Sequence, residues 1–85
     1  MWKNIKIIFN WKQYNIIFTN HAIDRMKERW ISLDLLKNSI EKYDRHFVNY
    51  WKEVVEKDFN LNTIRTVFSL KSNNIILITT ILLWK

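Results

Sequence analysis

Cysteine, glycine and proline are all absent from this sequence of 85 residues. Without cysteine, disulfide scaffolds, thiolate zinc sites and cysteine nucleophiles are excluded. Without glycine, the phosphate-binding loops of P-loop and Rossmann proteins and the nucleophile elbow of serine hydrolases are excluded as well. The chain must turn without the two residues that most often form turns. We therefore expect its ten asparagines to take the positions that need positive φ.

Patterns for metals and membranes are also missing. The two histidines lie far apart in the sequence and belong to no HExxH arrangement. The apolar run 75–84 is too short to span a bilayer, and residues 1–18 are interrupted by lysines, unlike the apolar core of a signal peptide. We therefore expect no metal, no cofactor, no membrane partner and a cytoplasmic protein.

What is present indicates one small globular domain over residues 1–85. The chain is 48% hydrophobic, with five Trp, five Phe and three Tyr, which is enough apolar material for a core. Its formal net charge of +6 points to an anionic partner, either nucleic acid or an acidic protein. The alternative is that the charge only keeps an aromatic-rich domain soluble.

Hydrophobic periodicity predicts the order β, α, α, β, β, β. Residues 5–9 and 14–18 are apolar stretches that form either a hairpin or one interrupted strand. Thr19 or Asn20 is the expected N-cap of a helix ending at Arg29, and Ser32 that of a helix over 33–42. From Arg45 the period changes to two, which predicts strands over 45–55, 63–70 and 75–84.

The same pattern predicts the packing. Two N-terminal helices should cover an antiparallel sheet, with the strand 75–84 central and buried on both faces. The segment 71–74 should form a type I′ hairpin turn through its asparagines. The residues that we expect to be buried are Ile23, Met26, Leu36, Ile40, Ile64, Val67, Phe68, Ile76 and Ile78.

Three cationic or titratable residues recur every four positions in the first helix. His21, Arg25 and Arg29 fall in one broad sector of that helix, away from its apolar sector. Imidazole titrates near neutral pH, and guanidinium binds phosphate. Each also has a plain structural explanation: His21 could cap the helix, Arg25 could pair with Glu28, and the stem of Arg29 could cover apolar surface.

A second group of polar residues lies in the predicted strands. Arg65 stands amid apolar neighbours, on a solvated face or aimed into a cleft. His46, Tyr50 and Lys52 should share one strand face and form a basic, aromatic surface. With Lys27 of the first helix, they are the predicted RNA-binding residues.

The segment FTNHAIDRMKERWIS, followed by a helix and then IRTVFSL, KSNN and IILITTILLW, resembles the DUF4258 family over residues 14–84. That resemblance implies a RelE/ParE-like (BECR-type) α+β domain, with two N-terminal helices packed on a curved antiparallel sheet. The family usually has glycine where this chain has Trp30. Because tryptophan is costly in the left-handed conformation, we expect the first helix to end differently here.

Taken together, the residues and the resemblance predict a metal-independent endoribonuclease, with the role of toxin in a toxin–antitoxin module implied by the family. The 2′-hydroxyl of RNA would attack the adjacent phosphorus, with His21 as base or acid and Tyr50 or His46 as the second proton-transfer group. Arg25, Arg29 and Arg65 would hold the phosphate. The expected partners are RNA, including mRNA on the ribosome, and an antitoxin protein. The alternative is a non-catalytic nucleic-acid- or protein-binding module, and a third hypothesis is self-association through a sheet edge.

Overall fold

The computed structural model describes residues 5–84, and in this part of the chain two helices stand between strands. In chain order the elements are β1 (Lys6–Phe9), β2 (Lys12–Phe18), α1 (Asn20–Glu28), α2 (Leu33–Glu41), β3 (Arg45–Asn49), β4 (Lys52–Asp58), β5 (Asn62–Lys71) and β6 (Asn74–Trp84). Residues 5–9 and 14–18 thus belong to a hairpin, one of the two alternatives that the sequence allowed.

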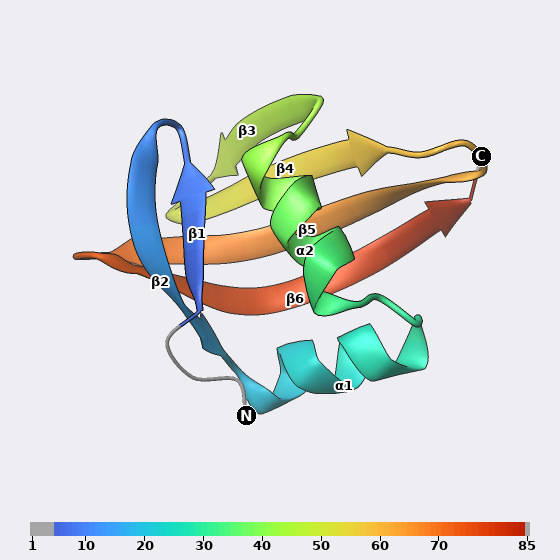
Figure 1. Ribbon diagram of the computed structural model, residues 1–85, viewed down its shortest axis with the longest axis horizontal. Helices are drawn as coiled ribbons and strands as arrows, with labels where there is room; N and C mark the ends of the chain where they lie inside the picture. Colours follow the sequence, from blue (N-terminus) through green and yellow to red (C-terminus); the bar gives the residue numbers. More distant parts are fainter. Residues whose placement is uncertain (1–4, 85) are drawn as a thin grey trace.

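One curved sheet contains all of these strands, in the order β1-β2-β6-β5-β4-β3. β2 and β6 are parallel, and the other neighbouring strands are antiparallel. In Figure 1, α2 crosses one face of the sheet and α1 lies along the side of β6.

The predicted arrangement of two N-terminal helices on an antiparallel sheet is therefore wrong. Strands hold 55% of the described residues and helices only 22%, so the domain is mostly sheet, shaped like half a barrel. The β1–β2 hairpin precedes the helices, and its second strand pairs in parallel with the last strand of the chain. The hairpin joins the sheet because alternate residues of it, such as Ile7 and Ile16, are buried in the core.

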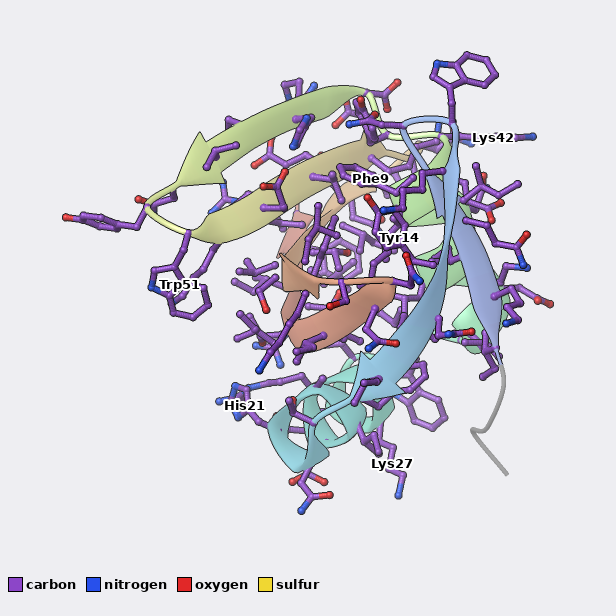
Figure 2. The ribbon with its side chains drawn as sticks, turned by 90° about the vertical axis from the view of Figure 1, so that its left-hand side faces the viewer. Phe9, Tyr14, His21, Lys27, Lys42 and Trp51 are labelled. Carbon is purple, nitrogen blue, oxygen red and sulfur yellow. The ribbon has the colours of Figure 1, made fainter. Side chains whose placement is uncertain are left out.

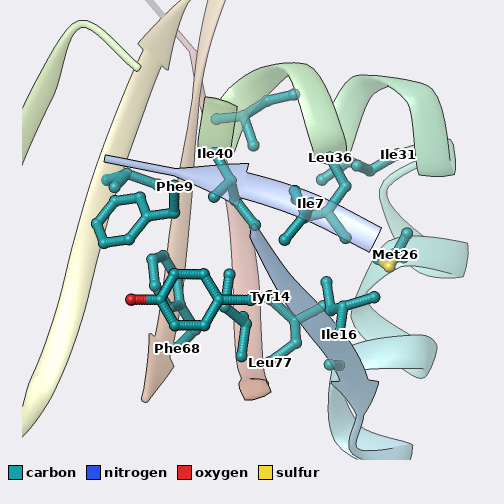
Figure 3. Close-up of a cluster of buried hydrophobic side chains, with 14 residues drawn as sticks. Ile7, Phe9, Tyr14, Ile16, Met26, Ile31, Leu36, Ile40, Phe68 and Leu77 are labelled. Atoms are coloured by element: carbon teal, nitrogen blue, oxygen red, sulfur yellow. The ribbon is translucent and has the colours of Figure 1, made fainter. Parts of the chain in front are cut away.

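The hydrophobic core lies between the helices and the sheet face that they cover, which we call the covered face (Figure 3). Five of the nine residues predicted to be buried are buried: Met26, Leu36, Ile40, Ile64 and Phe68. The other four, Ile23, Val67, Ile76 and Ile78, are half-buried. β6 is central in the sheet, as predicted, but neither helix covers its second face, which is why Ile76 and Ile78 keep some exposure.

The helix starts agree with the sequence-based predictions. The Thr19 side chain accepts a hydrogen bond from the Ala22 N–H, and Ser32 accepts one from the Leu35 N–H. Each cap satisfies one of the amide groups that the first turn of a helix leaves unpaired.

The end of α1 differs from the prediction. Trp30 has a φ of 57°, so it takes the left-handed conformation that glycine favours. The Ile31 N–H donates to the Met26 carbonyl and the Trp30 N–H to the Lys27 carbonyl, the two hydrogen bonds of a Schellman motif. Trp30 is 90% exposed. The helix thus ends as it would with glycine, and burial of Ile31 beside Met26 helps to offset a backbone cost of about 1–2 kcal/mol.

The predicted strand over residues 45–55 is in fact a hairpin. β3 ends at Asn49, Tyr50 and Trp51 form the turn, and β4 begins at Lys52. Tyr50 has a φ of 60°. The alternating pattern runs through the turn without a glycine or asparagine at its centre, so the sequence carries no turn signal there.

Asparagine replaces glycine in turns less often than expected. The described residues with positive φ are Asn10, Trp11, Trp30, Tyr50 and Ser72, so only one of them is an asparagine. Ser72 has positive φ but Asn73 does not, which rules out the predicted type I′ turn between β5 and β6.

Neither helix is long and apolar enough to cross a membrane.

Candidate nucleic-acid interface

The second face of strands β3 to β6, which neither helix covers, we call the open face (Figure 1). Cross-strand pairing places its side chains in rows. One row joins Arg45, Glu56, Arg65 and Ile81, and a second joins Phe47, Val54, Val67 and Thr79. Because side chains alternate along a strand, the intervening residues, such as His46 and Thr66, belong to the covered face.

A hollow of about 400 Å³ lies on the open face. Four strands contribute to its lining: Phe47 and Asn49 from β3, Lys52 and Val54 from β4, Arg65 and Val67 from β5, and Ile78, Thr79 and Ile81 from β6. Its floor is apolar, and its polar groups are two cations, an amide and a hydroxyl.

A shift of register in the β5–β6 pairing shapes this hollow. Phe68 pairs with Leu77 and Val67 with Thr79, so Ile78 is an extra residue on β6. Such β-bulges bend a strand and redirect side chains, and they are common beside binding sites. Here the bulge adds Ile78 to the lining.

Arg65 is held at the hollow by an ion-pair network on the open face. Its Nε donates to Glu56 Oε2 at 2.7 Å, while Arg45 Nε donates to Glu56 Oε1 at 2.8 Å. Both Nη atoms of Arg45 donate to Asp58. The Nη atoms of Arg65 find no partner within residues 5–84, so they can donate to a ligand.

The hydrogen bonds from Arg45 and Arg65 lower the pKa of Glu56 below its usual value. The hydrogen bonds that Arg45 donates to Asp58 and Glu56 raise the pKa of Arg45. Glu56 is therefore ionised at neutral pH, and both of its oxygens accept hydrogen bonds from arginine. It offsets part of the positive charge but fixes the direction of Arg65.

α1 begins beside β6, one of the strands that line the hollow. The Thr19 hydroxyl donates to the carbonyl oxygens of Leu77 at 2.9 Å and Ile78 at 3.4 Å, and Ile78 lines the hollow. His21 follows in the first turn of α1; it is exposed and has no hydrogen-bond partner among the described residues. Figure 2 shows His21 and Trp51 on the same side of the molecule and Lys27 on the other side of α1.

The two arginines of α1 share one carboxylate. Arg25 Nη1 lies 2.9 Å from Glu28 Oε1, and Arg29 Nη1 lies 3.5 Å from the same atom. The ion-pair alternative for Arg25 is therefore present in the fold. Both arginine side chains keep about a third of their surface exposed, so a phosphate can still reach them.

The predicted basic surface of His46, Tyr50 and Lys52 does not form, because the chain turns at Tyr50 and Trp51. His46 Nε2 lies 2.6 Å from Glu53 Oε1 on the covered face, where the His46 ring is nearly perpendicular to the ring of Phe9. Tyr50 is exposed in the turn. Lys52 alone reaches the hollow, and its Nζ lies 5.1 Å from the centre of the Trp51 ring.

Of the residues predicted from the sequence, Arg65 and Lys52 therefore both line the hollow. His21 lies on the same side of the molecule as Trp51. Phe47, Asn49 and Thr79 also line the hollow, and Glu56 orients Arg65; none of these four was predicted. Only the position of the β3–β4 turn shows that Phe47 and Lys52 share a face, and the sequence gives no signal for that turn. No group of three His, Asp or Glu side chains in the described part of the chain could hold a metal ion.

Comparison with protein-family models finds a match to the family described as "Domain of unknown function (DUF4258)" over residues 18–82. Neither the curated proteins nor the solved structures contain a match to the chain. The matched range includes α1, α2 and the strands that form the hollow. The family description states no activity, and the predicted RelE/ParE-like grouping is not confirmed.

Proposed function

We propose that the open face of this chain, which belongs to the DUF4258 family, binds RNA. The description of the family assigns no activity, so the proposal depends on the geometry of the site. The observation that carries this proposal is the meeting of Arg65, Lys52 and Phe47 around one hollow. Cations neutralise phosphates, and an aromatic ring in the same site adds a surface for a base.

The direction of Arg65 supports a role in phosphate binding. Glu56 engages its Nε and leaves its Nη atoms for a ligand, a geometry suited to forked hydrogen bonds with phosphate oxygens. Lys52 adds a second cation on the neighbouring strand. The net charge of +6 would draw an anionic polymer to the protein from a distance.

RNA cleavage is the second candidate function, and the exposure of His21 on the same side of the molecule as Trp51 favours it. In this reaction the 2′-oxygen bonds to the adjacent phosphorus as the bond to the 5′-oxygen breaks, giving a 2′,3′-cyclic phosphate and a 5′-hydroxyl. His21 would accept the proton of the 2′-hydroxyl or donate one to the leaving oxygen. Arg65, with Arg25 and Arg29, would stabilise the charge on the phosphoryl oxygens.

The fold narrows the choice of the second proton-transfer group. His46 is half-buried on the covered face and contacts Glu53, so it does not share a site with His21. Glu56 is ionised, but its low pKa and its two arginine partners make it a weak base. Tyr50, exposed at the tip of the β3–β4 hairpin, is the candidate that is left from the sequence-based prediction.

Two lysines allow a matched test of the binding proposal. Lys52 lines the hollow, whereas Lys42 lies at the end of α2 and, in Figure 2, across the molecule from Trp51, the neighbour of Lys52. Affinity for a labelled, unstructured RNA should fall steeply between about 50 and 200 mM salt. Lys52→Ala should flatten that salt slope by about 0.7–1 unit, and Lys42→Ala should leave it unchanged. Equal effects of the two variants, or no binding at low salt, would contradict the proposal.

Cleavage has a separate test. In EDTA, the parent should produce fragments that end in 2′,3′-cyclic phosphate, and His21→Ala should lower the rate by roughly 10²–10⁴-fold with RNA affinity nearly unchanged. Asn20→Ala, a change in the same exposed turn, is the control and should keep the parental rate. Arg25→Lys should also slow cleavage, because ammonium lacks the forked donors of guanidinium. A parent that binds RNA and never cleaves it would remove the catalytic role and leave the binding role intact.

A further inference from the structure

From the lining of the hollow we infer that it takes an unpaired nucleobase stacked on Phe47, so that the bound RNA is single-stranded. This inference rests on the proposed RNA binding and names the form of RNA that the same site selects. It adds a residue, Phe47, that the charge pattern alone does not indicate.

The first argument is the apolar floor. A site for phosphates alone needs cations and hydrogen-bond donors, yet Val54, Val67 and Ile81 form much of this hollow. Apolar surface of this kind favours the flat, weakly polar face of a base over a charged backbone. The volume of about 400 Å³ is in the range of small-molecule sites. In a duplex the base faces are stacked on one another, so only an unpaired base can enter.

The second argument is the position of Phe47. It stands directly across from Val54 in the β3–β4 register, and 46% of its surface is exposed. An aromatic ring beside a basic site is the usual platform for bases of single-stranded RNA, because each base has a face that can stack. The neighbour Val48 is 58% exposed but belongs to the other face of the same strand.

The third argument is the placement of polar groups around the apolar floor. Lys52 and Arg65 supply cations for the phosphates that flank a base, while the Asn49 amide and the Thr79 hydroxyl can hydrogen-bond its edge. Trp51 is 67% exposed at the tip of the β3–β4 hairpin and turns toward the side of His21 in Figure 2. The Trp51 ring offers a second stacking surface for the next base along the RNA.

The test compares neighbouring variants against two forms of one RNA. A labelled oligonucleotide of about eight nucleotides is titrated by fluorescence anisotropy, as a single strand and as a duplex with its complement. We expect the parent to prefer the single strand by at least about tenfold. Phe47→Ala should weaken single-strand binding roughly 5- to 150-fold, the range measured for loss of a stacked base, and Val48→Ala should change it less than about twofold.

Two further variants separate stacking from folding. Phe47→Leu keeps an apolar side chain of similar size without a ring and should lose most of the single-strand preference, whereas Phe47→Trp should retain it. Equal binding of duplex and single strand, or equal affinities of Phe47→Ala and Val48→Ala, would overturn the inference even when Lys52→Ala shows that RNA binding itself is real. If the parent binds neither RNA, the proposed function fails together with the inference.

Discussion

The covered and open faces of strands β3 to β6 are built from the same backbone and differ in what lies against them. On the covered face, Phe68 and Leu77 are fully buried in the core, where Phe68 packs against Phe9 of β1. One residue away on the open face, Val67 and Ile78 have comparable chemistry but are only half-buried around a hollow. The comparison shows that apolar character alone does not distinguish core from binding surface, because what lies against each face also sets the exposure of its side chains.

The two faces also differ in whether their buried polar groups have hydrogen-bond partners. On the covered face, the hydroxyls of Thr66 and Thr80 are buried without a hydrogen-bond partner in the described part of the chain. On the open face, the Glu56 carboxylate is also buried, but two arginines satisfy it. The buried groups without a partner on the covered face are neutral hydroxyls, whereas the buried carboxylate on the open face is charged, and a buried charge costs far more than a buried hydroxyl unless it is paired.

The largest effect should come from breaking the covered face. Phe68→Ala removes a fully buried ring that packs edge-on against Phe9, and should lower the free energy of unfolding by about 3–5 kcal/mol. Val67→Ala, next to it on the open face, should cost about 1 kcal/mol and weaken RNA binding instead. Urea unfolding of both variants measures the difference. Similar losses of stability would show that the open face is part of the core.

An intermediate effect should come from the ion-pair network. Glu56→Gln removes the carboxylate that joins Arg45 and Arg65, and should cost about 1–3 kcal/mol at neutral pH. The folded pKa of Glu56 lies below the ordinary value of 4.5. Its ionised form therefore stabilises the protein above that value, and the stabilisation is lost as the pH falls through the lowered folded pKa.

Unfolding curves from about pH 7 to about pH 3 should accordingly show a smaller acid-induced loss of stability in Glu56→Gln than in the parent. Glu28→Gln alters an exposed carboxylate on α1 and should cost little at neutral pH. If Glu56→Gln keeps the full acid dependence of the parent, the network does not stabilise the open face.

The smallest effect should be a gain in stability. Thr66→Val replaces an unsatisfied buried hydroxyl with a methyl group and should stabilise the fold by about 1 kcal/mol. Thr79→Val makes the same replacement at a half-buried position on the open face, where water reaches the hydroxyl, and should change stability less. Thermal unfolding distinguishes the two; a loss of stability in Thr66→Val would mean that its hydroxyl has a partner, such as a buried water.

The sequence was most informative where a structure depends on neighbouring residues. Thr19 and Ser32 cap their helices as predicted, because an N-cap needs only amide groups two or three residues away. Trp30 was interpreted wrongly by the same local reasoning. Its cost in the left-handed conformation is real, but the hydrogen bonds from Ile31 and Trp30 and the burial of Ile31 hold it there.

The candidate site was predicted only in part. The sequence indicates Arg65 as a cation amid apolar strand neighbours and Lys52 as part of a basic strand face, and the structure brings the two together. Phe47 was missed because residues 45–55 alternate without interruption, and a strand carried through Tyr50 and Trp51 gives the wrong partners to every residue after the turn. His46 was placed with Lys52 for the same reason.

By itself, the sequence determined the composition, the positive charge, the helix starts, the apolar strands and the membership of a family matched over residues 18–82. Only the tertiary structure decided that β2 pairs with β6, where Thr19 meets Leu77 across 58 positions of the chain. It also decided which face of each strand is covered and that Glu56 directs Arg65 toward a hollow. The physical reason is that caps and periodicity arise within a few residues, whereas strand pairing and burial depend on residues that only the completed fold brings into contact.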